Sequence, residues 1–585
     1  MEKRVLLAVF LSFLVLYAYQ SFVLKPPVPG PQRTPSTPST GAGQAATAPK
    51  AAPGTALPPP AGLGAAAAVA AATTPPVQAR VAAQTEQDIV VETRVVRAVF
   101  TNKGGRIKSW QLKRYLDKLG RPQELVPVDL PAGSALPFDL KVDDAAVTAR
   151  LREALFQPGG NLAGSRVDVT GAARTLRFDY EDGSGVKASK VFTFEPESYM
   201  IGFDAKVEGA GRQWNPTILW GPGLGDVHVA ASSYEQKPQG MIFRGDKVDR
   251  LNAKAIAGQP VYEDRFAVAG VDDHYFIAIA LPKRMVRVSY EPLVVPDPSG
   301  DPKKARNYMA FGLRQAESPA SLRFFFGPKD FDVLKAADKD IKLVRAINYG
   351  MLDIIVVPLL SALKWVNGFV GNYGWSIIIL TILINIVMFP LRHKSMVSMR
   401  KMQELQPEMK AIQERYGKLK ATDPEKQKMN AEVMNLYKTR GVNPAAGCVP
   451  MLLTLPVLFA FYSLLSQAIE MRGAPFMLWI QDLAAHDPLY ITPILMGASQ
   501  FWQQKMTPTS PDPNAAMQQK MMLMMPLVFM FMFLWAPSGL VIYWFASNLL
   551  AIGQQYLTNH LAGPAKVHAQ PPAVRKVGKV GRVAK

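Results

Sequence analysis

Hydrophobic and polar positions divide the chain into segments of two kinds. Long apolar stretches, near the roughly 20 residues with which a helix crosses a bilayer core, predict six spans: residues 1–24, 373–391, 447–466, 489–504, 521–536 and 538–557. Between the first two stretches, short runs alternate apolar with polar residues, which is typical of β-strands. The pattern predicts a polytopic α-helical membrane protein with six transmembrane helices and one large β-domain.

The amino-terminal apolar stretch resembles a signal sequence but is predicted to stay attached. Lys3 and Arg4 precede an apolar run longer than the usual core of about 7–15 residues in a cleaved signal, and no small-x-small cleavage motif follows before Lys25. We therefore expect residues 1–24 to be a signal anchor. Residues 25–85 contain thirteen prolines and long Ala/Thr/Ser tracts, so they are predicted to be a disordered linker.

The alternating runs place the β-domain at residues 86–335. The run RTLRFDY puts Leu176, Phe178 and Tyr180 on one face, the turn EDGSG follows, and YMIGFDAKV alternates again. The stretch VVRAVFTNKGGRIKSWQL predicts a hairpin with a Gly-Gly turn. Many short strands indicate a large sandwich. His228 and His274 lack a spacing that indicates metal or acid–base chemistry, so we expect both to be scattered surface residues.

An apolar segment between the β-domain and the second span is interrupted by Pro358, Gly368 and Gly371. We expect residues 340–372 to form an interfacial helix on the outer side of the membrane. A buried helix of the β-domain is the alternative.

A polar segment between the second and third spans, residues 392–446, has apolar residues every three or four positions. This spacing predicts a helical hairpin. The capping box TDPE at residues 422–425 marks the start of its second helix, and Pro407 is expected to kink its first helix.

Charge sets the predicted topology, because Lys and Arg in short loops favour the cytoplasm. The segment 391–446 carries twelve Lys/Arg against six Asp/Glu, and the tail 561–585 carries six Lys/Arg and no acid. The loop 467–488 has one base, Arg472. Both termini, the hairpin and the loop 505–520 are therefore expected inside, and the β-domain outside. The basic hairpin begins with a group of four bases, Arg392, Lys394, Arg400 and Lys401.

These bases have three possible roles: attraction of ribosomal RNA phosphates, attraction of anionic lipid, or a topology signal alone. The single cysteine, Cys448, excludes an internal disulfide framework and a cysteine cluster for a metal.

Polar side chains recur at helical spacing inside the predicted spans. Thr381 and Asn385 are four residues apart, and the same spacing relates Tyr543 to Ser547 and Trp544 to Asn548, while Gln503 closes the fourth span. These faces either converge on a water-reached cavity or form ordinary interhelical hydrogen bonds. The fifth span has seven methionines between residues 517 and 532, which suits varied apolar partners but also plain packing.

Several long motifs in the membrane part resemble the YidC family of bacterial membrane protein insertases. They are FVGNYGWSIIILT followed by FPL, NPAAGCVPMLLTLPVLFAFYSLL, APFMLWIQDLAAHDPLYITPILMG and PSGLVIYWFASNLLAIGQQ. The resemblance is dense from about residue 349 to residue 556 and looser over the β-domain, through ILWGPGLGD and FFFGPKD. The linker and anchor fit the Gram-negative form.

The resemblance implies a fold and a function. The fold is a five-helix insertase core preceded by an anchor, with a periplasmic β-supersandwich, in the inner membrane. The function is insertion and folding of nascent membrane proteins, alone or with the Sec translocon, with substrates received from ribosomes. No enzyme activity, cofactor or metal is implied. A hydrophilic groove open to cytoplasm and lipid would include Thr381, Asn385, Gln503, Tyr543, Trp544, Ser547 and Asn548. A hydrophobic slide would include Leu455, Pro456, Met525, Phe529 and Met532.

Asn385 departs from the family pattern, because many members carry an arginine there. Arg392 lies about two helical turns further on, beyond Pro390. We therefore expect a polar groove without a fixed charge, in which replacement of Asn385 by alanine is mild. A membrane transporter and a membrane-anchored periplasmic carbohydrate-binding protein are the alternative functions.

Overall fold

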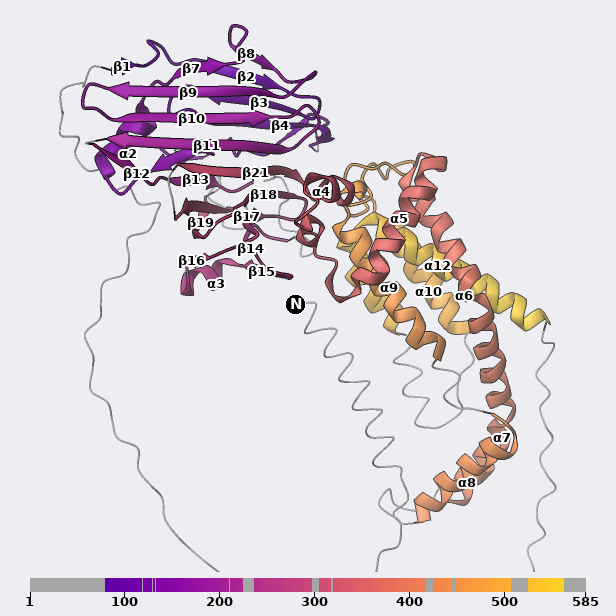
Figure 1. Ribbon diagram of the computed structural model, residues 1–585. Helices are drawn as coiled ribbons and strands as arrows, with labels where there is room; N and C mark the ends of the chain where they lie inside the picture. Colours follow the sequence, from indigo (N-terminus) through magenta and orange to yellow (C-terminus); the bar gives the residue numbers. More distant parts are fainter. Residues whose placement is uncertain are drawn as a thin grey trace, which may run out of the picture.

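The computed structural model describes residues 79–561, apart from residues 118, 129, 132, 210, 225–235, 297–304, 317–318, 417–424, 443–448 and 507–523. The predicted anchor, most of the linker, the basic tail, His228, Thr422 and Cys448 lie outside the described residues. The described chain forms a β-domain followed by a helical part, and helices α7 and α8 lie at the end of the helical part remote from the β-domain (Figure 1).

The β-domain contains three sheets. Its strands are β1 (Ala79–Val81), β2 (Asp88–Glu92), β3 (Val96–Thr101), β4 (Arg106–Leu116), β5 (Pro122–Glu124), β6 (Asp139–Lys141), β7 (Gln157–Gly160), β8 (Arg166–Asp168), β9 (Arg174–Asp182), β10 (Lys187–Phe194), β11 (Met200–Gly209), β12 (Arg212–Trp214), β13 (Thr217–Pro222), β14 (Gln239–Arg244), β15 (Lys247–Leu251), β16 (Val261–Asp264), β17 (Val268–Asp272), β18 (Phe276–Leu281), β19 (Val286–Val295), β20 (Arg306–Gln315) and β21 (Ala320–Pro328). Its helices are α2 (Ala145–Glu153), α3 (Ala253–Gly258) and α4 (Phe331–Ala337).

The eleven-stranded sheet has the order β1-β9-β10-β11-β21-β18-β17-β14-β15, with β12 and β7 attached at its sides. The two predicted alternating runs form β9 and β11, and β10, which was not identified from the sequence, lies between them and pairs with both. The predicted Gly-Gly turn joins β3 to β4, and both glycines have positive φ, which side chains disfavour. Lys190, fully buried, donates to the carbonyls of Gly104, Gly105 and Phe138 and so closes this turn.

Two predictions about this domain are corrected. β1 lies within the range predicted to be linker, because its backbone pairs with the edge of β9 although its side chains are small or charged. His274 is a buried residue, 4% exposed, and no surface residue. It is buried because the turn between β17 and β18 contacts the helical part, where the carbonyl of Ser466 accepts a hydrogen bond from the ring.

The helical part contains α5 (Asp353–Val370), α6 (Tyr373–Glu404), α7 (Gln406–Arg415), α8 (Glu425–Thr439), α9 (Val449–Gln467), α10 (Ile491–Met506), a helix over Met524–Trp535 and α12 (Ser538–Leu561). Short 3-10 helices lie at Leu343–Ala346, Gly350–Leu352, Ile469–Met471 and Phe533–Trp535. Among the described helices, two are long and apolar enough to cross a membrane, Asp353–Val370 and Tyr373–Ser398, and two are shorter apolar helices, Leu455–Gln467 and Met524–Trp535.

The predicted second span and the start of the predicted hairpin form one helix. α6 continues for 32 residues through Pro390 and ends at Glu404. Pro407 does not kink a helix, because it lies in the first turn of α7, where the N–H that proline lacks has no helical partner anyway. The hairpin itself is α7 paired with α8, through ion pairs of Arg440 with Glu408 and of Arg415 with Glu432.

Helix α5 packs one face on the helical part and leaves the other open. Val356, Leu360, Leu363 and Val366 are buried. On the opposite face, Trp365 and Phe369 are 64% and 77% exposed, and their rings contact each other. The predicted alternative, burial of this helix within the β-domain, does not fit that open face.

Candidate functional site: a polar row in the helical core

A row of polar side chains follows one face of α6. The Thr381 hydroxyl donates to the carbonyl of Ile377 over 2.6 Å, and the Asn385 amide nitrogen donates to the carbonyl of Thr381 over 2.8 Å. The Asn385 amide oxygen accepts a hydrogen bond from Nη1 of Arg392 over 2.5 Å. The arginine thus reaches back along the helix, because helical side chains lean toward the amino terminus and residues seven apart share a face.

This contact changes the expectation of a groove without charge. Arg392 belongs with the predicted groove residues and not with the hairpin bases, since its guanidinium lies at the Asn385 amide. It forms no ion pair with any Asp or Glu in the part of the chain that the structure describes. The spacing of seven residues between Asn385 and Arg392 was the signal in the sequence that allowed this contact.

Helix α12 provides the facing polar groups. Tyr543 of α12 lies near Arg392 of α6 and near Ser547, one turn further along α12. The Tyr543 ring is 6% exposed and stacks on Phe461 of α9, with centroids 4.3 Å apart and planes at 5°. Tyr543 is therefore held firmly, with its hydroxyl toward α6.

Other predicted groove residues have different surroundings. Asn548, 5% exposed, donates to the Ser499 hydroxyl on α10 over 3.1 Å, an ordinary interhelical hydrogen bond. Thr381 is fully buried, and Gln503 is half-buried on α10. The structure brings together Asn385, Arg392, Tyr543 and Ser547, and places Asn548 in a separate contact.

The predicted slide residues lie on α9 and the Met524–Trp535 helix. Leu455 and Pro456 are half-buried, whereas Met525 and Met532 are 48% and 46% exposed. The Phe529 ring packs against Trp544, with centroids 5.5 Å apart. These two rings join the apolar surface of the Met524–Trp535 helix to α12.

Of the predicted hairpin bases, Lys394 and Lys401 are exposed on α6. The Arg400 side chain lies outside the described residues.

The end of the helical part nearest the β-domain is closed by residues 473–490. The carboxylate of Asp487, fully buried, accepts hydrogen bonds from Trp479 Nε1, Leu489 N, Thr492 N and the Thr492 hydroxyl over 2.7–2.9 Å. Burial opposes ionisation, but these hydrogen bonds lower the pKa of Asp487 below its ordinary value. The Asp487 carboxylate therefore fixes this loop.

The same loop is joined to the first turns of α6 and α12. Phe476 packs so closely on Gly374 that a Cβ there would lie 2.1 Å from its ring. Gly539 N donates to the Leu483 carbonyl over 2.9 Å, and Ser538 N donates to the Ala485 carbonyl over 2.7 Å. Residues 473–490 therefore pack over the amino-terminal end of α6, the helix that carries the polar row.

A junction of buried groups joins the β-domain to α9. The His274 Nδ1 accepts a hydrogen bond from Gln236 N over 3.1 Å, so its Nε2 carries the proton and donates to the Ser466 carbonyl over 2.7 Å. Just beyond α9, the Arg472 guanidinium lies 5.1 Å from the centroid of the Phe276 ring and donates to Gln123 Oε1. Both contacts anchor the β-domain to the same end of α9.

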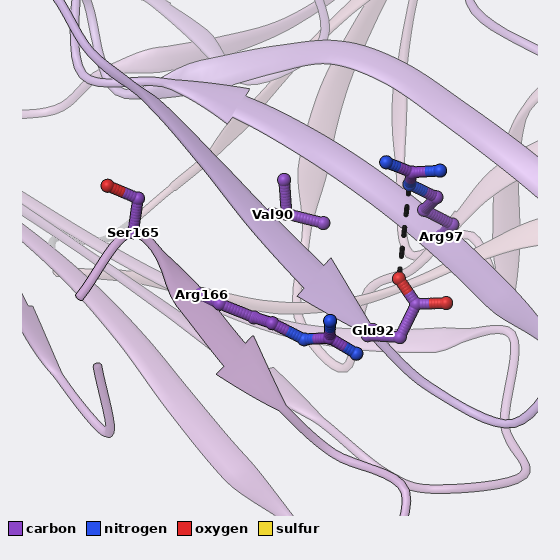
Figure 2. A pocket seen from close by; sticks show the side chains of 5 residues that line it. All are labelled: Val90, Glu92, Arg97, Ser165 and Arg166. Atoms are coloured by element: carbon purple, nitrogen blue, oxygen red, sulfur yellow. Dashed lines mark ion pairs between the residues drawn. The ribbon is translucent and has the colours of Figure 1, made fainter. Parts of the chain in front are cut away.

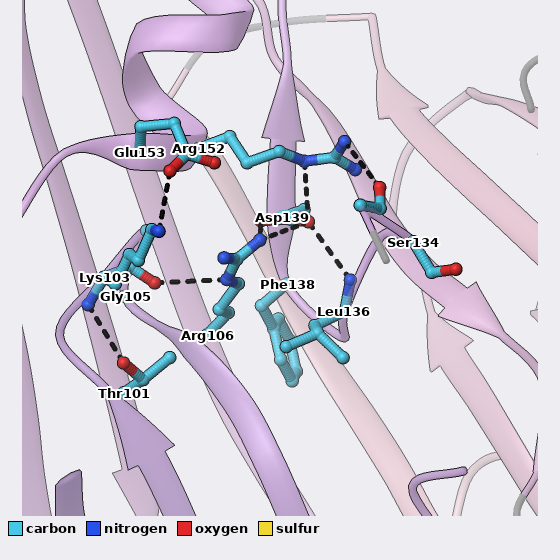
Figure 3. A network of polar contacts seen from close by, with 12 residues as sticks. Thr101, Lys103, Gly105, Arg106, Ser134, Leu136, Phe138, Asp139, Arg152 and Glu153 are labelled. Atoms are coloured by element: carbon cyan, nitrogen blue, oxygen red, sulfur yellow. Dashed lines mark hydrogen bonds and ion pairs between the residues drawn. The ribbon is translucent and has the colours of Figure 1, made fainter. Parts of the chain in front are cut away.

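The β-domain also holds charged clusters, which are paired internally. Asp139, 3% exposed, forms ion pairs with Arg106 and Arg152 and accepts a hydrogen bond from Leu136 N, as Figure 3 shows. A shallow depression of about 440 Å³ is lined by Val90, Glu92, Arg97, Ser165 and Arg166, and Glu92 pairs with Arg97 across it (Figure 2). Neither cluster presents an unpaired acid and base for catalysis.

Comparisons with known proteins identify the two parts of the chain. Residues 88–362 match the family model described as YidC periplasmic domain, and residues 365–564 match the one described as 60Kd inner membrane protein. A membrane protein insertase YidC of Syntrophus aciditrophicus is 37% identical over 96% of this chain and 100% of its own length. One from Citrifermentans bemidjiense is 37% identical over 96% of this chain and 99% of its own length.

A solved structure titled an active YidC insertase with the first transmembrane domain resolved is also similar. It has 19% sequence identity and a TM-score of 0.33, and the match covers 82% of this chain and 94% of that chain.

The chain belongs to the YidC family of membrane protein insertases. It is an inner-membrane protein with a β-rich periplasmic domain and a helical insertase core, and its substrates are nascent membrane proteins. An insertase of this family is not an enzyme.

Proposed function

We propose that a segment of a nascent membrane protein enters between α6 and α12, with its polar tail against the row formed by Asn385, Arg392, Tyr543 and Ser547. The observation behind this proposal is the position of that row. α6 begins at Tyr373, so Asn385 lies about 18 Å along the helix, well within a hydrocarbon core of about 30 Å. A polar tail that reaches these groups has a shorter apolar path left to cross.

Short helices beside the row would thin the membrane locally. α10 has 16 residues, or about 24 Å, and the Met524–Trp535 helix is shorter still, against a hydrocarbon core of about 30 Å. The exposed methionines of the Met524–Trp535 helix, with Leu455 and Pro456, form the slide along which the apolar part of the substrate moves into lipid. Burial of this apolar segment in lipid then drives release of the substrate, at about 25 cal/mol per Å² of apolar surface.

The remaining assignments complete the proposal. Six spans place both termini in the cytoplasm, with α5 lying on the periplasmic surface of the membrane through Trp365 and Phe369. Support for this topology is that the β-domain and the hairpin α7–α8 lie at opposite ends of the helical part (Figure 1). The hairpin, with Lys394, Arg400 and Lys401 at its base, and the basic tail receive substrates from ribosomes, and the protein works alone or with the Sec translocon.

Site-specific photocrosslinking to a ribosome-stalled nascent chain tests the path. A photoreactive residue at Asn385 or Trp544 is expected to label the substrate. One at Val387, which is 76% exposed on another face of α6, is the matched control and is expected to label lipid. Equal labelling of the substrate from Asn385 and Val387 would refute the path.

A further inference from the structure

We propose that the loop over the amino-terminal end of α6, residues 473–490, is anchored in the periplasmic leaflet of the bilayer by its tip, residues 475–478. The partner of this apolar tip is lipid, at the boundary between headgroups and acyl chains. The inference does not depend on a substrate path between α6 and α12.

The first argument concerns position. The helical part belongs to the inner membrane, and the β-domain is periplasmic. Phe476 in the tip packs on Trp375 in the first turn of α6, with ring centroids 5.4 Å apart. Trp375 is 46% exposed, and Tyr490, directly before α10, is 37% exposed. Tryptophan and tyrosine at the ends of membrane helices are typical of the lipid–water interface, so the tip lies at the level of that interface.

The second argument concerns the surface of the tip, which is apolar. Met477 and Leu478 are 43% and 69% exposed. Residues 473–490 contain no lysine or arginine. Their two carboxylates already accept hydrogen bonds, Asp482 from two backbone N–H groups over 2.9 Å and Asp487 from the four donors described above. Entry of the tip into lipid therefore requires no basic side chain to lose its water.

The third argument concerns the backbone of the tip, where three successive carbonyls each accept a hydrogen bond within the protein. The donors are Asn372 Nδ2 to the carbonyl of Phe476 over 2.9 Å, Ile480 N to that of Met477 over 3.1 Å and Gln481 Nε2 to that of Leu478 over 2.8 Å. A carbonyl in lipid needs a partner inside the protein because no water is present to supply one. An exposed loop in water has no such requirement, so this pattern favours lipid around the tip.

The fourth argument concerns strain. Leu478 has a positive φ of 54°, a backbone conformation that glycine or asparagine adopts at lower cost. Because most of its side chain is exposed, packing within the described chain does not offset that cost. Transfer of the same side chain into lipid would offset it.

Fluorescence quenching in vesicles measures the position of the tip. The full-length chain with Cys448→Ser and Met477→Cys carries an environment-sensitive dye at position 477, in vesicles of phosphatidylethanolamine and phosphatidylglycerol. The dye is expected to be quenched by a lipid with a nitroxide high on its acyl chain and to be shielded from iodide in the water. Val294→Cys, at an apolar residue of β19 that is 58% exposed, is the matched control, and its dye is expected to show the opposite pattern.

Variants at Leu478 separate anchoring from folding of the loop. Leu478→Asn fits the same backbone but removes the apolar side chain. It is expected to raise iodide access to the dye about tenfold, because moving a leucine side chain between water and an apolar environment changes an equilibrium by a factor of about 10 to 100. Leu478→Phe keeps an apolar side chain and is expected to retain quenching by the lipid nitroxide. Unchanged protease resistance of residues 473–490 in detergent would show that both variants keep the loop folded.

Three results would overturn the inference. Iodide quenching at position 477 equal to that at position 294 would place the tip in water. Shielding from both quenchers would assign the cover of the tip to protein, either the β-domain or a second copy of the chain. Unchanged lipid quenching in Leu478→Asn would show that the leucine does not hold the tip in the bilayer. Crosslinking of the nascent chain from Asn385 would be unaffected by any of these results, so the proposed path is tested separately.

Discussion

Acidification is expected to weaken the contact between the β-domain and α9 through His274. The Gln236 N–H points at Nδ1 and the Ser466 carbonyl takes the proton of Nε2, so only the neutral ring satisfies both partners. Burial, helped by the nearby Lys329 ammonium, lowers the pKa of His274 to about 4, against the opposing effects of Ser466 and Asp272.

Proton linkage gives the sign and the size of the loss in docking free energy that acidification causes through His274. A histidine whose pKa is lower in the docked state than in the open state stabilises docking fully above the open-state pKa of about 6.5. That contribution is lost as pH falls from about 6.5 toward 4, since the open state gains the proton first. With a docked-state pKa of about 4, the loss at pH 4.5 is about 2.5 kcal/mol.

Amide hydrogen exchange at the carboxyl end of α9 measures this loss. In the full-length chain, the protection of residues 464–468, corrected for the intrinsic pH dependence of exchange, is expected to fall about 70-fold between pH 7.5 and pH 4.5. The change attributable to His274 is the difference between wild type and His274→Gln, because Gln donates to the Ser466 carbonyl without titrating. Effects of pH that do not involve His274 are common to both proteins and cancel in that difference. An equal fall in both would refute the reasoning.

Three further changes test the packing. Gly374→Val is expected to lower thermal stability by about 1–3 kcal/mol through overpacking against Phe476, and Phe476→Ala in the same chain should recover part of that loss in a melting experiment. Lys190→Met leaves three buried carbonyls without donors and is expected to cost about 3 kcal/mol in denaturant unfolding of the β-domain; an unchanged midpoint would contradict this role. Asp487→Ala is expected to cost about 2–3 kcal/mol locally and to expose residues 473–490 to protease, and unaltered cleavage would show that the Asp487 carboxylate does not fix the loop.

Local patterns in the sequence were sufficient to identify several strands and one turn of the β-domain. Alternation predicted β9 and β11, and the Gly-Gly pair predicted the β3–β4 turn, because both depend on neighbouring residues. The pairing of Met200 in β11 with Phe325 in β21 was not predictable. No local sequence feature determines which of many similar strands pairs with β11. The strand order of the sheet therefore depends on the packing of the whole domain.

The sequence predicted which polar residues belong to the candidate site, but not which of them contact one another. Thr381 and Asn385 stand out because polar residues are rare in an apolar run. Arg392 was assigned to the hairpin because it follows Pro390, and a proline marks a boundary only when the helix ends there. Here α6 continues, so the arginine shares the helix and the face of Asn385. His274 was missed because its burial depends on a contact with a segment almost two hundred residues away.

The continuity of α6 connects the hairpin α7–α8 to the proposed substrate path through a single helix. With 32 residues, the helix is a rod about 48 Å long, and the bases Lys394, Arg400 and Lys401, which we propose to meet a ribosome, lie on the same rod as Asn385. A sideways load on α7 and α8 therefore acts as torque on the row of polar groups, with Pro390 as the most compliant point. If a ribosome docks at the hairpin, the force would tilt α6 against α12. The width of the proposed path would then change with the size of that force.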